Sequence, residues 1–158
     1  MNRLSKSVVV IGVCVLLAVV IIQFIPKKER NNGAAGTNAI TFIYNVPQRV
    51  DAVLKKACFD CHSNRTEYPW YSNVQPFAKF MESHVIQGKE ELNFDEFGSY
   101  PLKKQYNKLR SVESQLKDGA MPLKSYTLIH RDARLTKEEV DLLINWSRGT
   151  RNKINAKL

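Results

Sequence analysis

The sequence predicts a mostly α-helical protein in which one apolar N-terminal helix precedes a small helical domain. Three observations support this fold class. An apolar run with few interruptions fills residues 8–25. Several later segments place apolar residues at the three- and four-residue spacing of an amphipathic helix, with typical helix-end residues beside them. Finally, one of these segments leads directly into the pattern Cys58-Phe59-Asp60-Cys61-His62, around which the rest of the domain is expected to be arranged.

The composition limits the classes of partner. The chain of 158 residues carries a net charge of +9. Residues 1–46 hold five basic residues and one acid, so +5 remains for the rest, which suffices for one small domain with a single core. Its basic residues form no long run and no stripe with aromatic residues, so we expect no nucleic-acid partner. A mild positive charge instead suits docking to an acidic surface of a partner protein.

The apolar run of residues 8–25 predicts a helix about 27 Å long, close to the ~30 Å of a hydrocarbon core. Basic residues flank it on both sides, and the small residues of a signal-peptidase site are missing after it. We therefore expect residues 1–26 to be an uncleaved signal anchor that crosses a membrane. Residues 27–46, which are charged and then rich in Asn and Gly, predict a flexible linker.

The domain is expected to cover residues 47–150, followed by a basic tail over 151–158. Its first helix should begin at Pro47 and carry one apolar stripe into Cys58. A second helix should start near Pro76 and end before Gly88. The apolar face of this second helix, which we expect to point inward, consists of Phe77, Phe80, Met81, His84 and Val85.

Two further helices are expected to complete the domain. The third should open at Pro101 and end at Gly119. The last should begin with a capping box formed by Thr136 and Glu139, and Gly149 should stop it. This last helix is expected to cross the first one and to close the domain.

The pattern Cys-x-x-Cys-His is the signature of covalent c-type haem attachment. Two thiols about one helical turn apart can add across the two vinyl groups of one porphyrin, and the following histidine then lies beneath the iron. We therefore predict one haem c, attached covalently through Cys58 and Cys61, with His62 as the proximal iron ligand. A dithiol oxidoreductase or a zinc site is a weaker alternative, because a helix precedes the motif and no second cysteine pair exists.

The far side of the iron is expected to be occupied by Met121. A thioether suits low-spin haem iron, and a Gly-Ala-Met-Pro turn between two helices can cross the face of the haem. His84 is the alternative distal ligand, because the helical pattern turns it inward. Trp70 and Tyr71, in an aromatic segment interrupted by proline, are candidates for the wall of the haem pocket.

These residues resemble the small monohaem, haem-binding domain family of cytochrome c type found in bacterial envelope proteins. The resemblance implies a mostly α-helical cytochrome c fold and a redox role outside the cytoplasm. It also implies that Cys58 and Cys61 attach the haem and that His62 is an axial ligand, and it leaves the distal ligand open between Met121 and a histidine. The matching segments are residues 58–64, Tyr68-Pro69-Trp70-Tyr71, Leu92-Asn93-Phe94, Met121-Pro122 and residues 130–135.

The sequence thus predicts a membrane-anchored c-type cytochrome that transfers single electrons through one haem to redox partner proteins. Because thioether attachment takes place outside the cytoplasm, the haem domain should face the periplasm from the inner membrane. Six-coordinate iron with His62 and Met121 leaves no position for a substrate, so we do not expect an enzyme. The alternative is a haem-based sensor or a small haem enzyme with an open or labile sixth coordination site.

Overall fold

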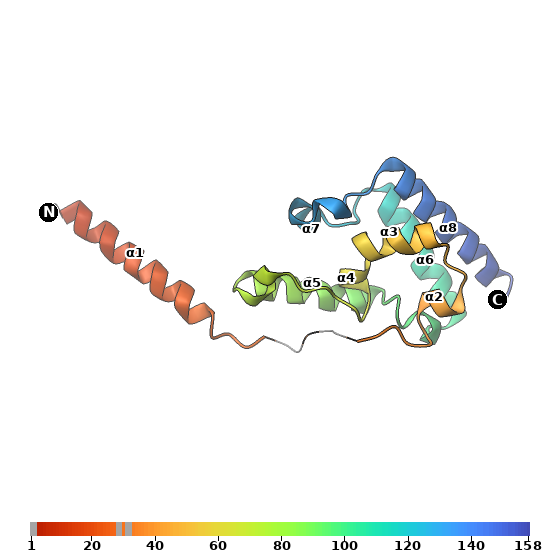
Figure 1. Cartoon of the computed structure of the whole chain (residues 1–158), viewed down its shortest axis with the longest axis horizontal. Helices are drawn as coiled ribbons and strands as arrows, with labels where there is room; N and C mark the ends of the chain where they lie inside the picture. Colours follow the sequence, from red (N-terminus) through yellow and green to blue (C-terminus); the bar gives the residue numbers. More distant parts are fainter. Residues whose placement is uncertain (1–2, 28–29, 31–32) are drawn as a thin grey trace. The chain divides into compact units, whose positions relative to one another are not determined.

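A computed structural model of the chain describes residues 3–27, 30 and 33–158 (Figure 1). Over these residues the regular structure is helical, which confirms the mostly α-helical class. The α-helices are α1 Arg3–Ile22, α2 Ile40–Ile43, α3 Gln48–Ala57, α4 Phe59–His62, α5 Phe77–Glu91, α6 Leu102–Lys117, α7 Lys124–Ile129 and α8 Lys137–Asn155. Three short 3₁₀ helices are η1 Trp70–Asn73, η2 Phe97–Ser99 and η3 Arg131–Ala133.

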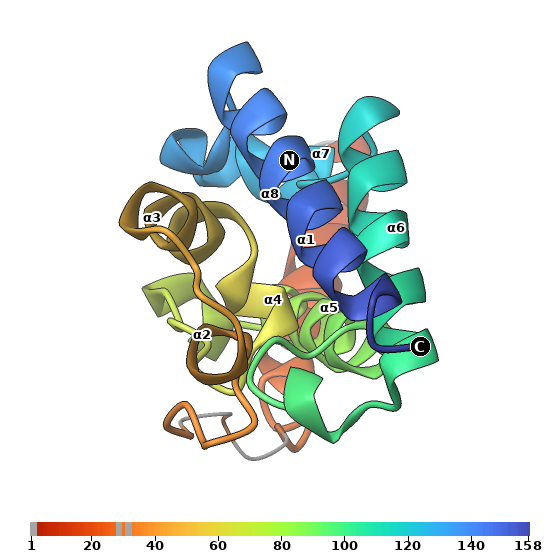
Figure 2. The same ribbon diagram turned by 90° about the vertical axis from the view of Figure 1, so that its right-hand side faces the viewer.

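The chain folds into two compact units. The first unit comprises residues 1–30 and 67–84, and the second comprises residues 31–66 and 85–158. The main hydrophobic core belongs to the second unit. There α6 and α8 lie side by side and α3 packs against α8, as predicted for the first and last helices of the domain (Figure 2). The core consists of Ile40, Val50, Val53, Leu54, Phe59, Leu92, Phe94, Phe97, Leu109, Leu116, Leu143, Ile144, Trp146 and Ile154.

The apolar stripe of α3 is buried as the sequence predicts. Val50, Val53, Leu54 and Ala57 all point into the core. At the start of α8 the capping box is present too, since Glu139 N–H donates to the Thr136 hydroxyl oxygen and Thr136 N–H donates to the Glu139 carboxylate. These two helices therefore form where local signals place them.

The end of the predicted linker packs onto the second unit. Ile40 is buried, and its N–H donates to the Phe94 carbonyl oxygen at 2.8 Å. The Tyr44 hydroxyl donates to Gln105 Oε1 at 2.6 Å. These contacts hold the last residues of the predicted linker on the second unit, although Phe42 stays exposed.

Two predicted helix ends are wrong. Helix α5 continues through Gly88 to Glu91, and α8 continues through Gly149 to Asn155. In α8 the residues beyond Gly149 still contribute to packing, because Thr150 and Ile154 are buried. This burial outweighs the roughly 1 kcal/mol by which glycine disfavours a helix interior. Part of the predicted basic tail is consequently helical and packed.

The inward face predicted for the second helix is also wrong at its first two positions. Phe77 and Phe80 are exposed, whereas Ala78 and Val85 are the buried residues of α5. Helix α5 is therefore rotated about its own axis so that the face with the small residue Ala78 packs inward. An exposed aromatic face remains on the first unit.

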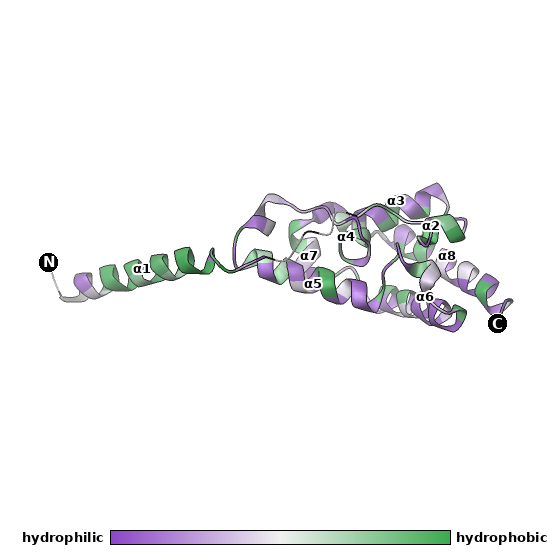
Figure 3. Cartoon of the chain, turned by 90° about the horizontal axis from the view of Figure 1, so that it is seen from below, coloured by the Kyte–Doolittle hydropathy of each residue, from purple (hydrophilic) through white to green (hydrophobic). Residues whose placement is uncertain are grey.

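The apolar N-terminal run does form a helix, α1, and hydrophobic residues cover nearly its whole length (Figure 3). Among the residues that the structure describes, no helix combines the length and the apolar character that a membrane crossing requires. The predicted helix is therefore confirmed, and its predicted role as a membrane span is not.

Candidate functional site

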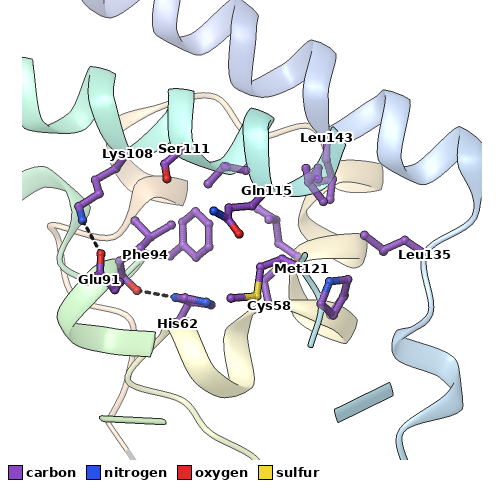
Figure 4. Close-up of a pocket in the computed structure, with 16 residues that line it drawn as sticks. Cys58, His62, Glu91, Phe94, Lys108, Ser111, Gln115, Met121, Leu135 and Leu143 are labelled. Atoms are coloured by element: carbon purple, nitrogen blue, oxygen red, sulfur yellow. Dashed lines mark hydrogen bonds and ion pairs between the residues drawn. The ribbon is translucent and has the colours of Figure 1, made fainter. Parts of the chain in front are cut away.

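A cavity of about 270 Å³ lies within the second unit (Figure 4). Its size is near the lower end of the roughly 300–1,000 Å³ found for ligand pockets. Three of the predicted site residues, Cys58, His62 and Met121, line this cavity together. The other lining residues, most of them apolar, are Leu54, Ala57, Glu91, Leu92, Phe94, Lys108, Ser111, Val112, Gln115, Leu116, Pro122, Leu135 and Leu143.

The two cysteines of the motif lie on one turn of chain. Helix α3 ends at Ala57, Cys58 has non-helical torsion angles, and α4 then forms a single turn in which Cys61 N–H donates to the Cys58 carbonyl oxygen at 3.2 Å. The one-turn separation that thioether chemistry requires is therefore present. Cys61 is half-buried and is not part of the cavity lining.

Both thiols are held in the neutral form. Burial, and secondly the neighbouring Cys61, raises the pKa of Cys58 to about 12. Burial, and secondly Asp60, raises the pKa of Cys61 to about 11. A dithiol oxidoreductase reacts through a thiolate of lowered pKa, so these surroundings do not favour that activity. Within the described ranges, no group of three or more His, Cys, Asp or Glu side chains could hold a metal ion by itself.

The imidazole of His62 is fixed by two backbone carbonyl groups. Its Nδ1 lies 2.8 Å from the Gly88 carbonyl oxygen and 3.0 Å from that of Leu92. Carbonyl oxygens only accept, so Nδ1 carries a proton, and in the neutral imidazole the lone pair then lies on Nε2. A histidine that ligates a metal through Nε2 needs this tautomer, and the carbonyl groups also set the plane of the ring.

Gly88 has a role that the sequence does not predict. A Cβ atom at this position would lie 2.6 Å from the Cys61 carbonyl oxygen and 3.1 Å from Cys61 Cβ. Helix α5 can pass this close to the motif only because residue 88 has no side chain. The same close approach brings the Gly88 carbonyl group to His62 Nδ1. The only signal in the sequence is a glycine inside an otherwise helical pattern.

Replacing Gly88 by Ala is expected to destabilise the protein by about 1–3 kcal/mol, because the added methyl group displaces backbone atoms of Cys61. The matched control is Gly149→Ala, since Gly149 also lies inside a helix but has no atom within 4 Å of an added Cβ. This control should gain about 0.5–1 kcal/mol from helix propensity. Thermal unfolding of both variants checks the prediction, and a gain in stability for both would contradict it.

Met121 lies in the loop between α6 and α7. Gly119 adopts φ +61°, a left-handed conformation that ends α6. The Gln115 carbonyl oxygen then accepts from Ala120 N–H at 2.9 Å and from Met121 N–H at 3.4 Å. The loop is thereby tied to the last turn of α6, and the half-buried Met121 side chain reaches the same cavity as His62.

A side-chain contact that the sequence does not reveal joins this loop region to the motif. The Tyr126 hydroxyl on α7 donates to Asp60 Oδ2 at 2.6 Å. Burial first, and then the Asp60 carboxylate, raises the pKa of Tyr126 well above its usual value. The His130 ring stacks on Tyr126 with centroids 4.3 Å apart. The short helix after Met121 is therefore held to the turn that carries both motif cysteines.

The remaining predicted site residues do not line this cavity. Trp70, Tyr71 and His84 belong to the first unit. The Trp70 side chain is exposed on η1, and His84 Nδ1 lies 2.8 Å from the Phe80 carbonyl oxygen, with the His84 ring against Phe80. The cavity thus brings together Cys58, His62 and Met121, but not the predicted aromatic wall or the alternative histidine ligand.

Comparison with known proteins identifies one match. The sequence model of a protein family described as a haem-binding domain matches residues 17–149. This range includes the whole lining of the cavity and both motif cysteines. No curated protein and no solved structure matches the chain.

Proposed function

Because the chain belongs to the haem-binding domain family, we propose that it is a c-type cytochrome that carries single electrons. One haem would be attached covalently through Cys58 and Cys61, with His62 and Met121 as axial ligands. The observation that carries this proposal is the shared cavity, which combines a motif thiol, an imidazole held through Nδ1 by two carbonyl groups, and a thioether. These groups fit a low-spin c-type haem.

Each residue has a definable role at this site. Bound haem supplies a one-electron ferrous–ferric couple. The carbonyl groups of Gly88 and Leu92 orient the His62 ring and hold the proton on Nδ1. The tethered loop keeps Met121 at the cavity, and the mainly apolar walls would limit the contact of a bound haem with water. If His62 and Met121 both bound the iron, no iron position would be left for a substrate, and the site would serve electron transfer rather than catalysis.

The test is a potentiometric titration of the full-length protein, followed by visible absorption. We expect one transition that fits a single electron, since the proposal contains one haem. His84→Ala is the matched control and should leave the potential unchanged, because His84 does not line the cavity. Two separate transitions, or a potential that moves in the control, would speak against this assignment.

We further propose that α1 and the residues after it anchor the protein in the inner membrane, with the haem domain in the periplasm. The apolar side chains of α1 are exposed along its length, and so much exposed apolar surface normally marks a binding interface. The apolar sequence continues past Ile22 to Ile25, and basic residues flank it. The protein should stay in the membrane pellet after an alkaline carbonate wash, and release into the supernatant would contradict the anchor.

Redox partners are proposed to be proteins with an acidic docking surface. The net charge of +5 on residues 47–158 would speed the encounter with such a surface. This effect weakens as salt is added, because ions screen the attraction.

A further inference from the structure

The first unit exposes a group of large apolar side chains that the hydrophobic pattern would place in a core. We call it the aromatic patch, and it consists of Trp70, Val74, Phe77 and Phe80. Trp70 is 78% exposed, Phe77 53% and Phe80 55%. Single exposed apolar residues are ordinary, whereas a group of this size within eleven residues indicates a surface that is covered by a partner.

The segment that carries the aromatic patch is tied to the chain that follows α1. The Gln23 side chain accepts from Gln75 N–H at 3.0 Å and donates to the Gln75 carbonyl oxygen at 3.2 Å. Lys27 Nζ donates to the Asn73 carbonyl oxygen at 2.5 Å. Arg30 also donates to the Asn73 side chain. All these residues belong to the same unit. The aromatic patch is therefore positioned at the end of the apolar helix.

The end of α1 has the same character as the patch. Phe24 and Ile25 lie two and three residues beyond the end of α1 and are 81% and 47% exposed. Next to them come Lys27 and Arg30, whose positive charges suit phosphate groups. Aromatic side chains are enriched at membrane–water interfaces, and basic side chains are attracted to the headgroups there. Both kinds of side chain lie here at the end of an apolar helix.

We propose that the aromatic patch docks onto the surface of the same lipid bilayer that α1 enters, with Trp70 and Phe77 at the level of the headgroups. We infer a bilayer rather than a protein because three polar side chains, Gln23, Lys27 and Arg30, hold the patch at the end of α1, whose apolar side chains are themselves exposed. This proposal rests on the proposed anchor, and it adds a second contact that holds the first unit against the membrane.

The two tryptophans of the chain provide the test. Trp70 is exposed and Trp146 is 9% exposed in the core of the second unit. The full-length haem-loaded protein and its Trp70→Phe variant are placed in vesicles of phosphatidylcholine and phosphatidylglycerol. The acyl chains are either ordinary or brominated close to the headgroup. The difference in emission between the two proteins is the contribution of Trp70.

We expect brominated lipid to remove most of the Trp70 contribution and to leave the Trp146 emission of the variant unchanged. The double variant Phe77→Ser/Phe80→Ser should lose much of this quenching, because the patch then binds the bilayer less well. Equal Trp70 emission in both kinds of vesicle would overturn the proposal. So would a Trp70 emission that is blue-shifted but insensitive to brominated lipid, because a protein partner or a second copy of this chain would then cover the patch.

A carbonate wash of the same vesicles separates this proposal from that of the anchor. If the protein resists the wash but Trp70 is not quenched, the anchor is supported and the docked patch is contradicted. If the wash releases the protein but Trp70 was quenched beforehand, the docked patch is supported and the anchor is contradicted.

Discussion

Replacing Cys58 and Cys61 together by Ser abolishes covalent haem attachment, according to the proposed chemistry. Serine has no thiol to add to a vinyl group, so no thioether can form even if the cavity still admits haem. Haem staining of the denatured protein on a gel, together with the mass of the intact chain, measures the effect. We expect complete loss of the stain and of the added mass of one haem.

The third cysteine is the matched control for this experiment. Cys14 lies exposed on α1 and outside the motif, so Cys14→Ser should retain one covalently bound haem. Each single variant, Cys58→Ser or Cys61→Ser, should keep at most one thioether bond. Full covalent attachment in the double variant would show that the motif does not attach the haem.

Replacing Met121 by Ala is expected to open the sixth coordination position. The weak far-red absorption of ferric haem with a methionine ligand should disappear, and carbon monoxide should bind rapidly to the reduced variant. Because methionine ligation raises the reduction potential, the potential should fall, on the order of 0.1 V or more within the ~0.8 V that axial ligands cover. Absorption spectra, carbon monoxide binding and a potentiometric titration measure these three effects.

Met81→Ala is the control for the loss of a methionine. Met81 is half-buried on α5 and does not line the cavity, so its replacement should change neither the spectrum nor the potential. If Met121→Ala keeps the far-red band and binds carbon monoxide slowly, another residue is the distal ligand. A parental protein that already binds carbon monoxide rapidly would instead support a haem sensor or a small haem enzyme.

Local signals in the sequence were sufficient for several elements. The apolar spacing of α3, the capping box of α8 and the glycine that ends α6 depend on residues close in the chain, and the structure confirms all three. Met121 and His62, which the sequence assigns to opposite sides of the iron, line one cavity. Their roles as iron ligands stay predictions.

Other predictions failed because tertiary contacts decided them. Gly88 looks like a helix stop, yet it is needed for a close approach to Cys61, which lies far away in the sequence. The same contact supplies a carbonyl group to His62, so the orientation of the His62 ring could not be predicted either. Helical spacing defined an aromatic face with Phe77 and Phe80, but spacing cannot tell whether the chain itself or a partner covers that face.

The absorption spectrum of the full-length protein, made in a host that matures c-type haem, tests the central claim most directly. The claim predicts six-coordinate, low-spin haem in both the ferric and the ferrous state, with the far-red band of methionine ligation in the ferric state. It also predicts that the colour stays with the protein after acid denaturation and extraction with an organic solvent. A colourless protein, or haem that passes entirely into the solvent, would contradict it.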